Sequence, residues 1–202
     1  MNPKEEIKEI RLQGRGGQGI VTAGELLGRA AISEGKFAQA IPTFGPERRG
    51  ALSTCSLRIS NRPILLKCSS TIADVLCLFD PTIWHFINIT AGFVEEKGTL
   101  IFNTTKSPEE INEELLSGRY GYKLASQSYS VFTVDATGIA LEIIGKPITN
   151  TAMMGGFAKA TGLIQMESVT SVLKEKFGNS ADINIESAMK AYENLEGGPF
   201  IK

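Results

Sequence analysis

The stretch GRGGQG, from Gly14 to Gly19, has residue types and spacing that suit the binding of an anion. Gly14, Gly16 and Gly19 fit the pattern G-x-G-x-x-G, and Gly17 adds a fourth glycine. Glycines allow a tight turn and a close backbone approach, and a helix that starts there directs free N–H groups and a partial positive charge at a ligand. We therefore treat the whole loop as a candidate binding segment: Gly14, Arg15, Gly16, Gly17, Gln18 and Gly19.

The residues after this loop do not complete a dinucleotide site. A NAD site calls for an acidic residue about 20 positions further on, at the end of the second strand, to accept from the ribose hydroxyls. Residues Ala38 to Ile41 occupy that place, and the nearest downstream acid, Glu47, lies in a loop rich in Pro and Gly. The pattern favours another phosphate-bearing ligand or an interface role over NAD or FAD, and a purely structural turn remains an alternative.

A second candidate is the arginine pair Arg48 and Arg49 in the loop TFGPERRGA. This loop follows the predicted second strand, so in a parallel sheet it lies at the same edge as the Gly loop. Two guanidinium groups there suit phosphates through charge and bidentate hydrogen bonds. A salt bridge to Glu47, or an anchor to a partner chain, is the alternative.

A third candidate is Asn150, which opens the segment NTAMMGGF. An asparagine at a helix start serves more often as an N-cap than as a ligand group. We expect Met153, Met154, Gly155 and Gly156 to pack tightly in the core or in an interface.

Conventional catalytic and metal-binding constellations are absent from the sequence. His85 is the only histidine, so it cannot belong to a His-rich metal site, and we expect a structural or surface residue. Cys55, Cys68 and Cys77 have spacings that match neither metal or cluster ligation nor a disulfide framework, so we expect reduced thiols in or near strands. The motifs of serine hydrolases, zinc proteases and P-loop enzymes do not occur. We predict no catalytic residue and no metal ligand in this chain.

Composition places the chain among soluble globular proteins. It has 202 residues, 42% of them hydrophobic and 21% charged, with a formal net charge of -1. That charge gives no general attraction to nucleic acid or anionic lipid. The charged start MNPKEEIKEI lacks the apolar core of a secretory signal, and no apolar run approaches a membrane span. We expect a cytoplasmic protein with neither a nucleic-acid nor a membrane partner.

The candidate residues are set among alternating strand and helix patterns. This alternation predicts a single α/β domain over residues 1–202, a three-layer α/β/α, Rossmann-like arrangement with a mostly parallel but mixed sheet and C-terminal helices. We expect the tail EGGPFIK to be mobile or a docking arm. The expected strands are Glu9–Gln13, Phe37–Ile41, a hairpin of Leu52–Ile59 with Ile64–Lys67, Asp74–Phe79, Gly98–Phe102 and Tyr129–Val134. The expected helices cover residues 20–33, 81–94, 108–116, 136–144, 151–161, 168–177 and 185–195.

Three segments in series, GRGGQG with IVTAGELLGRAA, FGPERRGA and NTAMMGGFAKATGLI, resemble the gamma subunit of 2-oxoacid:ferredoxin oxidoreductases, most closely the pyruvate (pyruvate synthase) branch. The resemblance covers nearly the whole chain. It implies a complex that decarboxylates a 2-oxoacid on thiamine diphosphate, passes electrons through [4Fe-4S] clusters to ferredoxin and releases an acyl-CoA. Thiamine diphosphate, Mg and the clusters would then belong to the alpha, beta and delta subunits or their fused equivalents.

The resemblance also implies a role for the candidate loops. The gamma subunit would correspond to the α/β domain that, in single-chain relatives, lies beside the active-site entrance and helps to accommodate coenzyme A. Residues 14–19, Arg48, Arg49 and Asn150 would then be the contacts. Coenzyme A carries a pyrophosphate and a 3'-phosphate and needs no ribose-binding acid. The residues ALSTCSLRIS after the arginines are not distinctive for pyruvate, so 2-oxoglutarate, a branched-chain oxoacid or another small oxoacid stays open as the substrate. A purely structural assembly subunit with vestigial ligand loops, or a complex that uses no coenzyme A, is the alternative.

Overall fold

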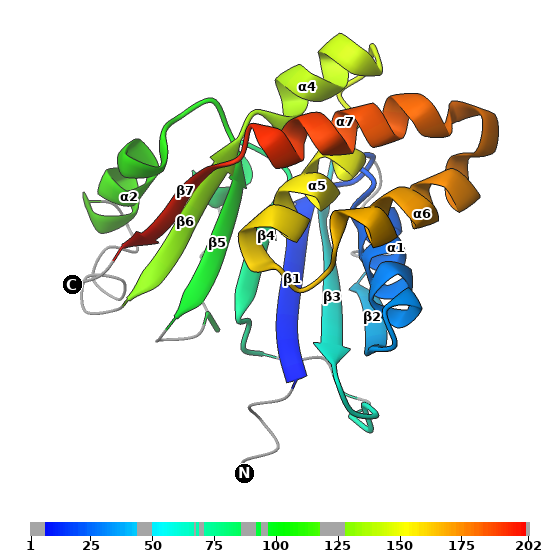
Figure 1. Ribbon diagram of the computed structural model, residues 1–202. Helices are drawn as coiled ribbons and strands as arrows, with labels where there is room; N and C mark the ends of the chain where they lie inside the picture. The colour runs from blue at the N-terminus through cyan, green and yellow to red at the C-terminus, as the bar shows by residue number, and fades with distance from the viewer. Residues whose placement is uncertain are drawn as a thin grey trace.

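The computed structural model describes residues 7–43, 50–66, 68, 71–85, 92–93, 97–117 and 128–200, in which one seven-stranded mixed sheet forms the centre (Figure 1). The strand order is β2-β3-β1-β4-β5-β6-β7. Strands β1, β4, β5 and β6 are parallel, β3 lies antiparallel between β2 and β1, and β7 is antiparallel to β6. The predicted mixed sheet is confirmed. The strands are β1 (Ile7–Arg15), β2 (Phe37–Thr43), β3 (Leu52–Ser60), β4 (Val75–Leu78), β5 (Gly98–Asn103), β6 (Tyr129–Val134) and β7 (Glu196–Phe200).

Helices cover both faces of the sheet, as the three-layer prediction requires. The larger hydrophobic cluster joins one sheet face to α1, α4, α5, α6 and α7. The smaller cluster joins the other face of β4, β5 and β6 to α2. Successive strand residues enter different clusters, as Leu76 and Cys77 of β4 show, because side chains alternate along a strand. The helices are α1 (Ile20–Ser33), α2 (Pro108–Ser117), α4 (Ala136–Ile143), α5 (Asn150–Thr161), α6 (Met166–Phe177) and α7 (Ala181–Glu193).

Side-chain caps stabilise the starts of two helices. At α2, the Ser107 hydroxyl accepts from the Glu110 amide at 3.2 Å, and the Glu110 carboxylate accepts from the Ser107 amide at 2.8 Å. This reciprocal pair is a capping box. At α4, the Asp135 carboxylate accepts from the Gly138 amide at 2.7 Å.

The predicted hairpin of Leu52–Ile59 with Ile64–Lys67 is wrong. Residues 64–66 form no strand, and Lys67 lies outside the described residues. Both edges of β3 are already paired, with β1 on one side and β2 on the other, so β3 has no free edge for a returning strand. Instead, the Leu66 carbonyl accepts a hydrogen bond from Arg58 at 3.3 Å.

The predicted helix over residues 81–94 is also incorrect at its described ends. A turn at Pro81 and Thr82 is followed by a short 3-10 helix, Ile83–His85. Phe93 forms an isolated parallel bridge with Ala73, which a helical residue could not do. Residues 86–91 and 94 lie outside the described part of the chain.

The C-terminal tail is neither mobile nor a docking arm over its described length. Residues Glu196–Phe200 form β7, whose register places Gly198 opposite Val131 of β6. The sequence EGGPF lacks the β-branched residues and alternation that reveal a strand. Its conformation is set by the free edge of β6, which is a tertiary effect that the local pattern does not contain.

Candidate functional site

The Gly loop lies at the carboxyl end of β1 and leads directly into α1. Strand β1 extends through Arg15, beyond the predicted end at Gln13, so the turn itself comprises Gly16–Gly19. Gly17 and Gly19 have φ values of 102° and 75°, in the left-handed region that favours glycine. The predicted order of strand, tight turn and helix is confirmed.

The start of α1 offers hydrogen-bond donors to an anion. Gly19 is the N-cap, no side chain caps the helix, and its first turn contains no acidic residue. Within the described ranges, the amides of Gly17 and Gly19 have no hydrogen-bond partner, whereas Gly16 donates to the Ala51 carbonyl at 2.8 Å. The first N–H groups of a helix also lack intrahelical acceptors, and the positive end of the helix dipole lies there.

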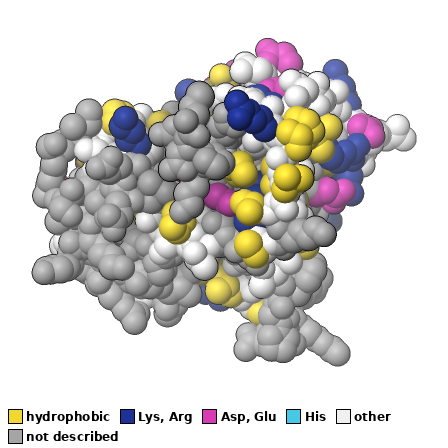
Figure 2. Space-filling model, turned by 90° about the horizontal axis from the view of Figure 1, so that it is seen from below, with side chains coloured by type: hydrophobic (Ala, Val, Ile, Leu, Met, Phe, Trp, Pro, Cys, Tyr) yellow, Lys and Arg dark blue, Asp and Glu magenta, His cyan; other side chains and the backbone are white. Residues whose placement is uncertain are grey.

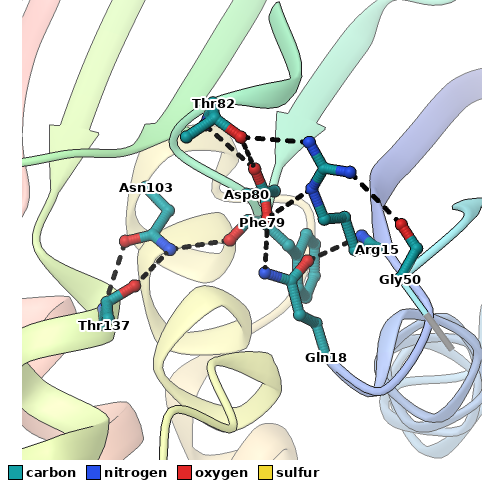
Figure 3. A network of polar contacts seen from close by, with 8 residues as sticks. All are labelled: Arg15, Gln18, Gly50, Phe79, Asp80, Thr82, Asn103 and Thr137. Atoms are coloured by element: carbon teal, nitrogen blue, oxygen red, sulfur yellow. Dashed lines mark hydrogen bonds and ion pairs between the residues drawn. The ribbon is translucent and has the colours of Figure 1, made fainter.

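The Arg15 side chain is held by groups of the protein itself (Figure 3). Its Nε atom lies 3.2 Å from Oδ2 of Asp80, a residue that directly follows β4 and the buried Phe79. Nη1 donates to the Gly50 carbonyl and Nη2 to the Thr82 hydroxyl, each at 3.2 Å. These contacts join the Gly loop to the ends of two other chain segments.

Gln18 completes the connection between the turn and Asp80. Its Oε1 atom accepts from the Arg15 amide at 2.7 Å, and its Nε2 atom donates to Oδ2 of Asp80 at 3.0 Å. Oδ1 of Asp80 in turn accepts from the amide and the hydroxyl of Thr82, at 2.9 and 2.6 Å. Burial alone would raise the pKa of Asp80, but the Thr82 hydrogen bonds, the Arg15 charge and the Gln18 amide hold that pKa below its ordinary value. The carboxyl group is therefore ionised at neutral pH.

A second polar contact fixes the next strand end. Asn103, at the end of β5, donates to the Phe79 carbonyl at 2.6 Å and to the Thr137 hydroxyl at 2.8 Å. Its Oδ1 atom accepts from the Thr137 amide at 3.1 Å. Asn103 is buried, so these bonds align the carboxyl ends of β4 and β5 with the start of α4.

Asn150 lies against the Gly loop, as the sequence-based hypothesis requires. A Cβ atom added at Gly19 would come within 2.8 Å of Nδ2 of Asn150. Thr149, rather than Asn150, occupies the N-cap of α5, and Oδ1 of Asn150 accepts from the Thr151 amide at 2.9 Å. The N-cap interpretation is thus off by one residue, while the proximity of the two segments is real. The expected core packing of Met153, Met154, Gly155 and Gly156 in α5 is confirmed.

Arg48 and Arg49 lie outside the described residues. The residues that follow them are described and lie at the Gly loop: Gly50 donates to the Gly16 carbonyl at 3.4 Å, and Gly16 donates back to Ala51. The end of the arginine loop therefore meets the turn.

Sequence reasoning missed the groups that organise this edge. These groups are Asp80, Thr82, Asn103 and Thr137. Asp80 and Asn103 share one signal, since each is a polar residue at the end of an apolar strand. Such residues meet at the carboxyl edge of a parallel sheet.

The cysteines and His85 do not take part in the polar contacts described above for the Gly loop and Asp80. All three cysteines are free: Cys55 and Cys77 are buried in strands, as expected, and Cys68 is exposed. Burial raises the pKa of Cys55 to about 11 and also raises the pKa of Cys77. His85 is exposed, as expected for a surface residue. Across the described ranges, no group of three or more His, Cys, Asp or Glu side chains could hold a metal ion, and no helix is long and apolar enough to span a membrane.

The structure defines a Rossmann-like α/β domain with a glycine-rich turn between β1 and α1 at the carboxyl edge of its sheet. The family model described as pyruvate ferredoxin/flavodoxin oxidoreductase matches residues 9–194, so the chain belongs to that family. It is the gamma subunit of a 2-oxoacid oxidoreductase complex, a class of protein that works together with other subunits.

Relatives of known name cover almost the whole chain. The chain is 46% identical over 189 residues to the common gamma subunit of the pyruvate/ketoisovalerate oxidoreductases of Pyrococcus furiosus, covering 93% of this chain and 97% of that one. It is 39% identical over 188 residues to pyruvate synthase subunit PorC of Methanocaldococcus jannaschii, with coverage of 93% and 96%.

Solved structures agree in fold. The Thermotoga maritima pyruvate oxidoreductase subunit PORC matches with a TM-score of 0.79 at 29% identity, over 95% of this chain and 98% of that one. A Magnetococcus marinus 2-oxoglutarate:ferredoxin oxidoreductase, solved with 2-oxoglutarate, coenzyme A and succinyl-CoA bound, matches with a TM-score of 0.68 at 19% identity. The match covers 93% of this chain and 30% of that longer one, and shows a shared fold.

Proposed function

We propose that this gamma subunit forms the coenzyme A side of the active-site entrance in its complex. The ligand groups would be the Gly14–Gly19 loop, the Arg48–Arg49 pair and Asn150. The complex would convert pyruvate or a related 2-oxoacid to an acyl-CoA and CO₂ and reduce ferredoxin.

The observation that carries this proposal is the start of α1, which no side chain caps. The unpaired amides of Gly17 and Gly19 and an uncapped helix supply donors and positive potential without a full charge. A pyrophosphate or a pantetheine oxygen of coenzyme A could accept from them. No acidic ribose-binding residue is needed, which agrees with the absence of an acid at the end of β2.

The positive charge that would bind a phosphate must come from residues other than Arg15. Arg15 is paired with Asp80, so these two side chains together carry no net charge. Arg48 and Arg49, which precede Gly50 in the sequence, would supply the positive charge next to the turn. The Asn150 side chain, next to Gly19, would add an amide donor or acceptor.

The ligand itself is suggested by comparison. The Magnetococcus marinus enzyme, whose matching part has this fold, was solved with coenzyme A. That likeness is one of fold, and it makes coenzyme A the ligand to test first.

We further propose that thiamine diphosphate, Mg and the [4Fe-4S] clusters reside on alpha, beta and delta subunits or their fused equivalents. Thiamine diphosphate would supply the carbanion chemistry of decarboxylation, and the clusters would carry electrons to ferredoxin. The cytoplasmic location expected from the sequence stays a prediction.

The test is the apparent KM for coenzyme A in the assembled complex with Arg49→Ala. Loss of a charge-assisted contact to phosphate should raise this KM by roughly tenfold or more, with the KM for the oxoacid unchanged. Arg29→Ala is the matched control, because Arg29 lies in α1 and pairs with Glu175 on the surface. An unchanged coenzyme A KM in an intact Arg49→Ala complex would sink the proposal and favour a purely structural subunit.

A further inference from the structure

Each of the three guanidinium nitrogens of Arg15 faces an acceptor of the protein itself. Nε faces the Asp80 carboxylate, Nη1 the Gly50 carbonyl and Nη2 the Thr82 hydroxyl, all at 3.2 Å. In Figure 3 the guanidinium lies between the Asp80 and Thr82 side chains on one side and Gly50 on the other. A planar guanidinium presents its N–H groups in a fixed fork, so three acceptors around it determine its orientation.

The Asp80 carboxylate is fixed from several directions at once. Besides its ion pair with Arg15, it accepts hydrogen bonds from the amide and hydroxyl of Thr82 and from the Gln18 side chain. Its side chain is only 9% exposed, so it cannot exchange these partners for water without opening the site. Arg15 is thus held against a rigid acceptor.

The third acceptor of Arg15 is the Gly50 carbonyl, which lies shortly before the start of β3 at Leu52. Gly50 and Ala51 are bonded to Gly16 in both directions, at 3.4 and 2.8 Å. The bond from Nη1 to the Gly50 carbonyl adds a side-chain tie to this backbone pair. The position of the chain immediately after Arg49 therefore depends on where Arg15 is held.

We propose that Arg15 and Asp80 are positioning residues, and that their ion pair holds the Gly16–Gly19 turn and the Gly50–Ala51 segment at the spacing that coenzyme A requires. This inference rests on the proposed coenzyme A site. Arg15 then contributes to coenzyme A binding by positioning other groups, while its positive charge is neutralised by Asp80. Asp80 is required for affinity although it adds a negative charge beside a site for phosphates.

A direct role of Arg15 in phosphate binding predicts the opposite effect of an Asp80 substitution on the affinity for coenzyme A. If Arg15 were a direct phosphate ligand restrained by Asp80, removal of the carboxylate charge would free the guanidinium and strengthen binding. If the pair positions the loops, the same change weakens binding. Asp80→Asn, which keeps the shape of the side chain, separates the two.

The kinetic test uses the assembled complex. For Asp80→Asn we expect the apparent KM for coenzyme A to rise roughly tenfold, with kcat at saturating coenzyme A and the KM for the oxoacid little changed. Arg15→Lys should raise it as much as Arg15→Gln, because lysine keeps the charge but not the fork. A lower coenzyme A KM in Asp80→Asn, or rescue by Arg15→Lys, overturns the inference.

A second measurement does not depend on coenzyme A. Amide hydrogen exchange of peptides containing Gly16 and Gly50 in the ligand-free complex should accelerate in Asp80→Asn and Arg15→Gln, and not in the surface control Arg29→Lys. Unchanged exchange overturns the inference whatever the kinetics show. Faster exchange with an unchanged coenzyme A KM in all variants supports the tie between the loops and refutes the coenzyme A site itself.

Discussion

Asn150 of α5 lies directly against Gly19, the N-cap of α1: a Cβ atom built on Gly19 would come within 2.8 Å of the Asn150 amide nitrogen. This contact joins two helix starts that are far apart in the sequence, at the carboxyl edge of the sheet. Gly19 also has a φ of 75°, so a side chain there meets both backbone strain and a steric conflict.

We expect Gly19→Ala to destabilise the chain more than Gly17→Ala. Gly17 has a φ of 102°, but an added Cβ meets no atom within 4 Å, so only the left-handed strain of about 1–2 kcal/mol applies. Gly19→Ala adds the displacement of Asn150 from its buried position. Urea unfolding of both variants measures the difference. Equal losses of stability would contradict the contact.

The Asp80 carboxylate should make stability depend on pH on the acid side. Its pKa is lowered in the folded chain, so the stabilisation is present above the unfolded pKa of about 3.9 and is lost as pH falls through the folded value. Asp80→Asn should cost about 1–3 kcal/mol at pH 7, through lost charge-assisted hydrogen bonds.

Urea midpoints at pH 7, 5 and 3 would measure this effect. The difference in urea midpoint between the wild-type chain and Asp80→Asn should be constant from pH 7 to 5 and shrink toward pH 3. Glu175→Gln is a control, since Glu175 forms an exposed ion pair on α6 and should show little change. A gap that widens on acidification would mean that the sign of the pKa shift is wrong.

Arg58 should be among the most sensitive charged positions in the described chain. It is 2% exposed, and its guanidinium lies 2.8 Å from the Glu9 carboxylate and 2.9 Å from the Gln39 amide oxygen. Arg58→Met removes one partner of a mostly buried ion pair, and we expect a loss of about 3–5 kcal/mol in unfolding free energy.

A double-mutant cycle checks the cause. Glu9→Gln in the Arg58→Met background should recover part of the loss, because Glu9 no longer leaves an uncompensated charge. Arg29→Met, which breaks a surface pair, should cost at most about 1 kcal/mol. If Arg58→Met costs no more than Arg29→Met, burial of the pair has been overestimated.

The sequence predicts an element well where the pattern that forms it lies within the element itself. The apolar spacing of Ile20, Ala23, Leu26 and Leu27 predicts α1 with the bounds that the structure has, and Ser107 and Asp135 cap the helices assigned to them. The Gly loop followed in the same way from the glycines between a strand and a helix.

Features that depend on distant partners could not be read from the sequence. The tail EGGPF becomes β7 because β6 offers an edge. Residues 64–66 fail to form a strand because β1 and β2 already occupy both edges of β3. Asp80 and Arg15 are separated by the whole of β2 and β3, and only the parallel pairing of β1 with β4 brings them together.

The adjacent glycines of α5, Gly155 and Gly156, should respond to alanine in opposite ways. Helix α5 crosses α7 so closely that a Cβ atom at Gly155 would lie 1.9 Å from the Ala188 carbonyl oxygen. At Gly156 the nearest atom, the end of the Leu195 side chain, would be 3.4 Å away, an ordinary contact. Alanine in place of glycine within a helix otherwise gains up to about 1 kcal/mol.

Gly156→Ala should therefore be neutral or slightly stabilising, while Gly155→Ala must push α5 and α7 apart and should cost about 2 kcal/mol or more. Thermal and urea unfolding of the two variants test this, with identical helix propensity at both positions as an internal control. Because Asn150 lies at the start of the same helix, a displaced α5 should also weaken coenzyme A binding in the assembled complex. Equal stability of the two variants would mean that α5 and α7 are not in backbone contact at Gly155.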